Sequence, residues 1–187
     1  MMELAEERDL AERGLLGEAE DFKKIVDTFS PPLLALALNI LGNREDAEDA
    51  CQETFLRAYL HRDSFDLERS LRNWLMTILY RRCLDHLKKK KRFKIFFNRA
   101  AWESPESVRG VPPAPVSGPK LLPPRLLDLL SPRERTALSL WANEGYTAEE
   151  ISRIIDCSAS TARVYLFNAR KKIKAFLEKD NGTMRTR

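Results

Sequence analysis

Polar and basic side chains gather between Ser158 and Lys174, and their types suit the binding of nucleic acid. In a helix, this segment would turn apolar residues to one side at every third or fourth position. The opposite side would carry Ser160, Thr161, Arg163, Val164, Phe167, Asn168 and Lys171. Such a helix can lie in the major groove of DNA, with its first residues at base edges and its later cations at phosphates.

A second group of cations follows an aromatic segment in the first half of the chain. Its members are Arg81, Arg82, Lys88, Lys89, Lys90, Lys91, Arg92 and Lys94. Trp74, Tyr80 and Phe93 are interleaved with them. Cations beside aromatic rings suit single-stranded or distorted DNA, where bases stack and phosphates need neutralising. The alternative is a set of core aromatic residues on a helix with a solvated end, and for Trp74 core packing is favoured over stacking.

The C-terminal group of polar residues is preceded by three helix starts. Ser131 to Glu134 and Thr147 to Glu150 are capping boxes, and Pro132 stands at a favoured first helical position. Ser158 can cap the third helix. The short turn at Asp156, a residue type that tolerates left-handed backbone conformations, predicts a helix-turn-helix.

The N-terminal half also has a helical apolar pattern. A stripe from Phe22 to Phe29 is interrupted by Pro31-Pro32, and a nearly all-apolar helix is expected over 33–41. A further helix should begin near Arg44. Its predicted buried face comprises Ala47, Ala50, Cys51, Thr54, Phe55 and Ala58. Its other face comprises Asp49, Gln52, Glu53, Leu56 and Leu60. Exposed leucines beside acids suggest a protein-binding surface.

The chain divides at a proline-rich segment, because seven of its ten prolines lie between residues 105 and 124. This composition predicts a linker between two helical modules. We therefore expect an all-α protein of two small domains over 1–98 and 125–180, joined by a flexible linker over 99–124, with a disordered tail over 181–187. No strand-like alternation is present.

Charge and composition limit the possible functions. Residues 1–80 hold 9 Lys/Arg and 17 Asp/Glu, a balance of −8, whereas the remainder holds 23 and 11, a balance of +12. This split suggests a protein partner for the acidic half and phosphates for the basic half. No metal-ligand spacing, nucleophile–base pair or phosphate loop is present, so neither an enzyme nor a metal, cofactor or small-molecule substrate is expected. The three cysteines read as small buried residues, and no basic-then-apolar leader or apolar run of 18 residues is seen, so a cytoplasmic protein without direct membrane insertion is expected.

Two segments resemble bacterial extracytoplasmic-function (ECF) RNA polymerase sigma factors. LGNREDAEDACQETFLRAY, followed by Trp74-Leu75 and the run from Asp85 to Lys89, is similar to their region 2. LLDLLSPRERTALSLWANEGYTAEEISRIIDCSASTARVYLFNARKKI is similar to their region 4. The order and spacing of the two segments agree with the family.

The resemblance implies an alternative sigma factor that directs core RNA polymerase to promoters and assists promoter opening. It implies docking on the β′ clamp helices through Asp49, Gln52, Glu53 and Leu56. It implies contact with the −10 element by the 64–70 segment and by Arg72, Asn73, Trp74, Arg81, Arg82, Lys88 and Lys89. The residues given above for 158–174 would read the −35 element, and region 4 would touch the β flap. Family members are commonly held inactive by an anti-sigma factor, so such a partner is expected as well.

Two other interpretations stay open from the sequence. Residues 131–174 also resemble the output domain of LuxR-type transcriptional regulators, although that interpretation leaves the N-terminal half unexplained. A sigma-like protein could also bind polymerase or an anti-sigma factor without initiating transcription. Val164 and Phe167 stand where the family usually has polar or basic residues; they could contact thymine methyls or a covering protein.

Overall fold

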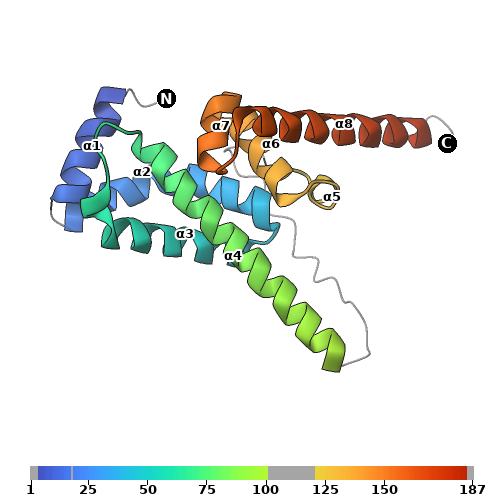
Figure 1. Ribbon diagram of the computed structural model, residues 1–187, viewed down its shortest axis with the longest axis horizontal. Helices are drawn as coiled ribbons and strands as arrows, with labels where there is room; N and C mark the ends of the chain where they lie inside the picture. The colour runs from blue at the N-terminus through green and yellow to red at the C-terminus, as the bar shows by residue number, and fades with distance from the viewer. Residues whose placement is uncertain (1–3, 18, 101–120, 185–187) are drawn as a thin grey trace. The chain divides into compact units, whose positions relative to one another are not determined.

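The computed structural model describes residues 4–17, 19–100 and 121–184, and the chain forms two compact units over 1–119 and 120–187. All regular structure in the described residues is helical (Figure 1), which confirms the all-α prediction. The first unit contains α1 (Leu4–Leu16), α2 (Ala19–Leu41), α3 (Arg44–Leu60), η1 (Arg62–Ser64) and α4 (Leu71–Ala100). The second contains α5 (Pro124–Leu127), α6 (Pro132–Glu144), α7 (Ala148–Ile154) and α8 (Ala159–Met184).

The core of the first unit lies between α2, α3 and α4, with α1 packed against α2. Fully buried side chains from α2 and α4 include Ile25, Phe29, Leu75 and Leu79. The buried face of α3 contains the six predicted residues, 47, 50, 51, 54, 55 and 58, which confirms the apolar pattern of that helix. The sequence patterns did not indicate α1, which buries Ala11 and Leu15.

The predicted interruption at Pro31-Pro32 is wrong, because α2 continues through both prolines. A proline inside a helix removes the hydrogen bond to the carbonyl four residues earlier. Here those carbonyls belong to Asp27 and Thr28, which are exposed residues, so water can replace the lost donors. Ser30 Oγ also donates to the Val26 carbonyl at 2.6 Å in the same turn.

Within the described residues, one helix, spanning Glu20–Leu41, is long and apolar enough to cross a membrane by length and composition. The sequence prediction counted only uninterrupted apolar runs and so did not detect it. Its most apolar side chains, among them Leu33 and Ile40, are fully buried in the first unit.

The predicted boundary between α2 and α3 is confirmed. Gly42 has a left-handed φ of 78°, and Asn43 caps α3 by accepting the Asp46 N–H at 2.8 Å. A positive φ suits glycine, which has no Cβ to clash with the backbone.

The second unit contains the predicted helix-turn-helix. Both capping boxes are present, at Ser131 with Glu134 and at Thr147 with Glu150. Asp156, in the turn before α8, has φ 54°, as its residue type suggested. The core includes the fully buried Leu140, Ile151 and Ile154, and one face of α8 packs on α6 and α7.

The helices extend beyond the predicted domain bounds at three places. α4 continues to Ala100, α5 begins at Pro124, and α8 continues to Met184. Most of the predicted linker, residues 101–120, and the last three residues of the predicted tail lie outside the described residues.

Candidate functional site

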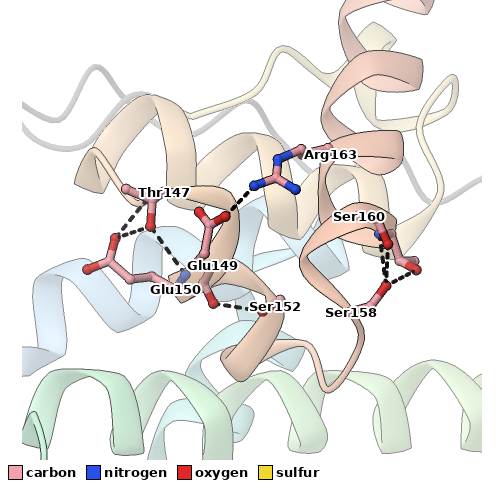
Figure 2. A network of polar contacts seen from close by, with 8 residues as sticks. Thr147, Glu149, Glu150, Ser152, Ser158, Ser160 and Arg163 are labelled. Atoms are coloured by element: carbon pink, nitrogen blue, oxygen red, sulfur yellow. Dashed lines mark hydrogen bonds and ion pairs between the residues drawn. The ribbon is translucent and has the colours of Figure 1, made fainter.

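The first turn of α8 is organised by the hydroxyl of Ser158 (Figure 2). Ser158 Oγ accepts the Thr161 N–H at 3.1 Å, which confirms the predicted helix cap. The same oxygen lies 2.8 Å from Ser160 Oγ and 2.8 Å from Thr161 Oγ1. These contacts hold two of the predicted −35 residues in one hydroxyl cluster at the start of the helix.

Arg163, one turn further on, forms an ion pair with Glu149 of α7, as Figure 2 shows. The Glu149 carbonyl in turn accepts the Ser152 hydroxyl at 2.7 Å. The side chains of the ion pair are 61% and 54% exposed. Exposed ion pairs contribute little stability, so the guanidinium can exchange this carboxylate for a base edge or a phosphate at small cost.

The remaining predicted −35 residues lie on the side of α8 that faces away from the core. Val164 and Phe167 are 53% and 66% exposed, Lys171 is exposed, and Asn168 is half-buried. The opposite side holds the buried residues Ala162, Leu166 and Ala169. The accessible face of the helix is therefore mixed, with hydroxyls first, then Arg163, then the apolar Val164 and Phe167, and then Asn168 and Lys171.

An apolar groove between α6 and α8 was not recognised from the sequence. It is lined by Leu138, Trp141, Arg170, Ile173, Lys174, Leu177 and Glu178. The Arg170 guanidinium lies 4.0 Å from the centroid of the Trp141 ring, which is a cation–π contact. Trp141 and Leu177 could have indicated this groove from the sequence, because both are large apolar residues outside the buried stripe of their helices, and both are exposed.

In the first unit, the predicted −10 residues at the start of α4 are half-buried. The Arg72 guanidinium lies over the Phe29 ring at 5.7 Å. The Trp74 ring lies 4.8 Å from the ring of Phe65, in the segment before α4. The carbonyl of Asn73 accepts the Thr77 hydroxyl. Trp74 thus packs against this segment while remaining partly accessible.

The predicted cations further along α4 differ in how firmly they are held. Arg82, with its side chain 19% exposed, forms an ion pair with Asp85 at 2.9 Å. Lys88 lies 3.6 Å from the same carboxylate. Arg81 and Lys89 are exposed.

Lys90 connects this basic segment to α3 by a 2.7 Å ion pair with Asp46. Burial raises the pKa of the Asp46 carboxyl, but the hydrogen bonds from Lys90 and Asn43 outweigh burial and lower this pKa overall. The ion pair therefore joins the basic part of α4 to α3, but the Lys90 side chain is 57% exposed, so the pair adds little stability.

The outward side of α3 carries the predicted polymerase-docking residues. Asp49, Gln52 and Leu56 are exposed, and Leu60 continues their stripe one turn later. Leu56 and Leu60 are 59% and 62% exposed. Glu53 lies at the flank of this stripe, half-buried, with its Oε1 3.7 Å from His86 Nε2 of α4.

Catalytic and metal chemistry have little support in the described residues. No group of His, Cys, Asp and Glu among them could hold a metal ion. Burial raises the pKa of the Cys51 thiol to about 12 and also raises that of Cys83, so neither is a thiolate near neutral pH.

Comparison with protein families agrees with the two-unit architecture. The model for Sigma-70 region 2 matches residues 25–93, and the model for Sigma-70, region 4 matches residues 124–173.

Individual relatives match over different shares of the chain. The chain is 40% identical over 75 residues to the ECF RNA polymerase sigma factor SigW of Bacillus subtilis, a match spanning 40% of each protein. It is 30% identical over 150 residues to the ECF RNA polymerase sigma factor EcfG of Rhodopseudomonas palustris, covering 80% of this chain and 81% of that protein.

Two solved structures have a similar fold. The sigma factor RpoE of Bartonella quintana, in complex with the anti-sigma factor NepR, is 25% identical with a TM-score of 0.70, covering 85% of this chain and 98% of that one. CnrH, in complex with the cytosolic domain of CnrY, is 22% identical with a TM-score of 0.68, covering 93% of this chain and 98% of that one.

Proposed function

Because this chain belongs to the ECF family of RNA polymerase sigma factors, which direct the polymerase to promoters, we propose that its two units divide that work. The first unit docks on the polymerase and contacts the −10 element. The second unit contacts the −35 element. The chain is not an enzyme, since the family acts by placing and opening DNA rather than by making or breaking bonds.

The docking surface we propose is the exposed stripe of α3 formed by Asp49, Gln52 and Leu56. An exposed leucine among acidic and polar groups suits a basic partner with an apolar contact, and the β′ clamp helices are the expected partner. Glu53 lies at the flank of this stripe and contributes to the docking surface, although its carboxylate also contacts His86.

The −10 surface we propose comprises the segment before α4, the first turn of α4, and the cations of its middle. Arg72, Asn73 and Trp74 would contact unstacked bases. The cations further along, Arg81, Arg82, Lys88 and Lys89, would contact the backbone. Unstacking a base costs a few kcal/mol, which such contacts offset.

The −35 surface we propose is the accessible face of α8. One observation carries this proposal: the seven predicted residues lie on α8, directly after a helix-turn-helix turn, and none is part of the buried core. Arg163 would reach a base edge or phosphate, and the methyl groups of thymine would meet Val164 and Phe167.

Run-off transcription with core polymerase over genomic fragments tests the proposal. The expected result is a set of start sites absent without this protein. If no new starts appear while the protein still binds polymerase, a sigma-like protein that does not initiate is the better description. A LuxR-type regulator is disfavoured by the match of residues 25–93 to region 2.

The docking surface and the −35 surface can be tested separately. Asp49→Lys should weaken core polymerase binding by roughly tenfold or more, since repulsion replaces attraction, while Asp27→Lys on an exposed part of α2 should not. Glu53→Lys is a poorer test, because it also disturbs the contact with His86.

Arg163→Ala should reduce −35-dependent initiation by roughly ten- to hundredfold. Arg153→Ala, an exposed arginine of α7, is the matched control. An unchanged promoter preference in the Arg163 variant would exclude that residue from the −35 surface.

We also propose the location and partners of the protein. It acts in the cytoplasm, where its polymerase is, and it is held inactive by an anti-sigma factor, as the complexes with NepR and CnrY suggest for its relatives. Its domains are placed at 1–98 and 125–180, with the linker between them over 99–124. Co-purification of a single partner that blocks run-off transcription would test the regulatory part of this proposal.

A further inference from the structure

Glu7, on α1, is a buried acid that contacts a distant part of the chain. The residue is 7% exposed. Its Oε1 accepts the Ser70 hydroxyl at 2.7 Å and the Arg72 N–H at 2.8 Å. Ser70 directly precedes α4, and its own Oγ accepts the Asn73 N–H at 3.2 Å. The first turn of α4 is therefore capped twice, once by its neighbour in sequence and once by a carboxylate more than sixty residues away.

The chemistry of this contact favours strong hydrogen bonds to Glu7. The first N–H groups of a helix have no partner within the helix, and the helix dipole favours a negative charge at this end. Hydrogen bonds to a charged acceptor are stronger than neutral ones, and burial shields them from competing water. A side chain without an acceptor oxygen at position 7, such as alanine, would remove this acceptor from the backbone N–H of Arg72.

A second contact ties the same helix to the same segment. Arg8 forms a 2.6 Å ion pair with Glu68, whose side chains are 57% and 72% exposed. This exposed pair adds little energy. Ala11 and Leu15, each 1% exposed, anchor α1 in the core. The segment between α3 and α4 is thus fastened to a helix that lies before residues 25–93, the part of the chain matched by the region 2 model.

We infer that Glu7 is a positioning residue for −10 recognition: it fixes the 65–70 segment and the first turn of α4 before DNA arrives. This inference rests on the −10 role proposed above for Arg72, Asn73 and Trp74. A surface that is already ordered binds unstacked bases without losing further conformational entropy on binding. The competing explanation is that Glu7 only stabilises the fold.

Hydrogen exchange in the whole chain tests whether the hydrogen bonds to Glu7 order the 65–74 segment. Glu7→Ala should speed exchange of the amides at 65–74 by roughly tenfold or more, with the amides of α3 unchanged. Glu7→Gln should restore most of the protection, because the amide oxygen can still accept both hydrogen bonds. Glu12→Ala, which removes an exposed acid of the same helix, is the matched control. Unchanged exchange at 65–74 in the alanine variant would overturn the inference.

Binding measurements with the holoenzyme test the functional part. The first probe is a single-stranded oligonucleotide carrying the non-template −10 sequence of a promoter found in the run-off experiment, and the second is a duplex carrying its −35 sequence. Glu7→Ala should bind the first roughly tenfold more weakly, while −35 duplex binding and core polymerase affinity stay within about twofold of the original protein.

Each other outcome counts against the inference. Unchanged oligonucleotide binding would show that the hydrogen bonds to Glu7 do not position the −10 surface. Parallel losses for the oligonucleotide, the −35 duplex and the polymerase would show a general loss of folding. A wild-type holoenzyme that selects no promoter would overturn the proposed function, and the −10 role given to Glu7 with it, whereas the exchange result would still report on the contact.

Discussion

Glu134 links the start of one helix to the middle of another in the second unit. It is 5% exposed, its Oε2 accepts the Ser131 N–H at 2.7 Å, and Lys172 of α8 lies 2.7 Å from the same oxygen. Burial raises the pKa of this carboxyl, but the contacts with Lys172 and Ser131 outweigh burial and lower the pKa overall. One carboxylate thereby joins α8 to the start of α6.

Glu134→Gln should destabilise the protein by about 1–3 kcal/mol, because the buried carboxylate is replaced by a neutral amide and its hydrogen bonds with Lys172 and Ser131 are no longer charge-assisted. Glu150→Gln, in the other capping box, should cost about 0.5–1 kcal/mol, because its carboxyl is less buried. Urea unfolding followed by circular dichroism measures both. An equal or larger cost at Glu150 would contradict the role given to burial.

The same measurement has an expected pH dependence. Because folding lowers the pKa of Glu134, its stabilisation is complete above the unfolded value, about 4.3, and is lost as pH falls through the lower folded value. The deficit of Glu134→Gln should therefore shrink in acid below about pH 4.

The cysteines differ from one another more than the sequence suggested. Cys51 and Cys83 are buried as predicted, but Cys157 is half-buried in the turn before α8. Burial raises all three thiol pKa values, that of Cys51 to about 12.

Iodoacetamide at pH 8 should modify Cys157 first in the native protein, and Cys51 and Cys83 only after unfolding. The physical reason is that alkylation needs a thiolate and an open approach, and the two buried thiols offer neither. Peptide mass spectrometry after timed quenching measures the three rates. Rapid modification of Cys83 in the native state would contradict the burial of α4 against α3.

At the scale of elements, local chemistry could be predicted from the sequence and long-range contacts could not. The caps at Ser131, Thr147 and Ser158 each depend on residues within three positions, so they could be predicted from the sequence. Glu7 contacts residues more than sixty positions away, and α1 has too few large apolar residues to give a clear stripe. The orientation of Glu53 toward His86 likewise depends on how α3 and α4 pack.

The continuity of α2 leads to a prediction about its prolines. Pro31→Ala should stabilise the protein by about 1–2 kcal/mol, because alanine restores an N–H donor for the Asp27 carbonyl at an exposed site. This gain should outweigh the loss of stability that comes from a more flexible unfolded chain without the proline. Pro132→Ala is the matched control, because Pro132 stands at the first position of α6, where proline is well tolerated. Thermal unfolding should show a higher Tm only for the first variant. A lower Tm for Pro31→Ala would mean that the proline itself shapes the packing of α2.

At the scale of the molecule, charge is divided unevenly along the chain. The first 80 residues carry a balance of −8 and the rest a balance of +12. The stripe of Asp49, Gln52 and Leu56 on α3, proposed to contact a protein, is exposed, and so are Arg81, Lys88, Lys89 and Lys171, which are proposed to contact DNA. Because the chain forms two compact units, with a −10 surface proposed on one and a −35 surface on the other, contacts on the two surfaces should act independently.

Independence can be measured with a double-mutant cycle on Arg163→Ala and Asn73→Ala. Each variant should lower the equilibrium for open-complex formation, the first by about 1–3 kcal/mol. The two losses should add within about 0.5 kcal/mol, because residues without shared contacts rarely couple. Permanganate reactivity of unpaired thymines, measured across polymerase concentrations, gives the four equilibria. Coupling between Arg163 and Asn73 clearly above about 1 kcal/mol would mean that the two units read the promoter as one surface, and separate −10 and −35 roles would then have to be abandoned.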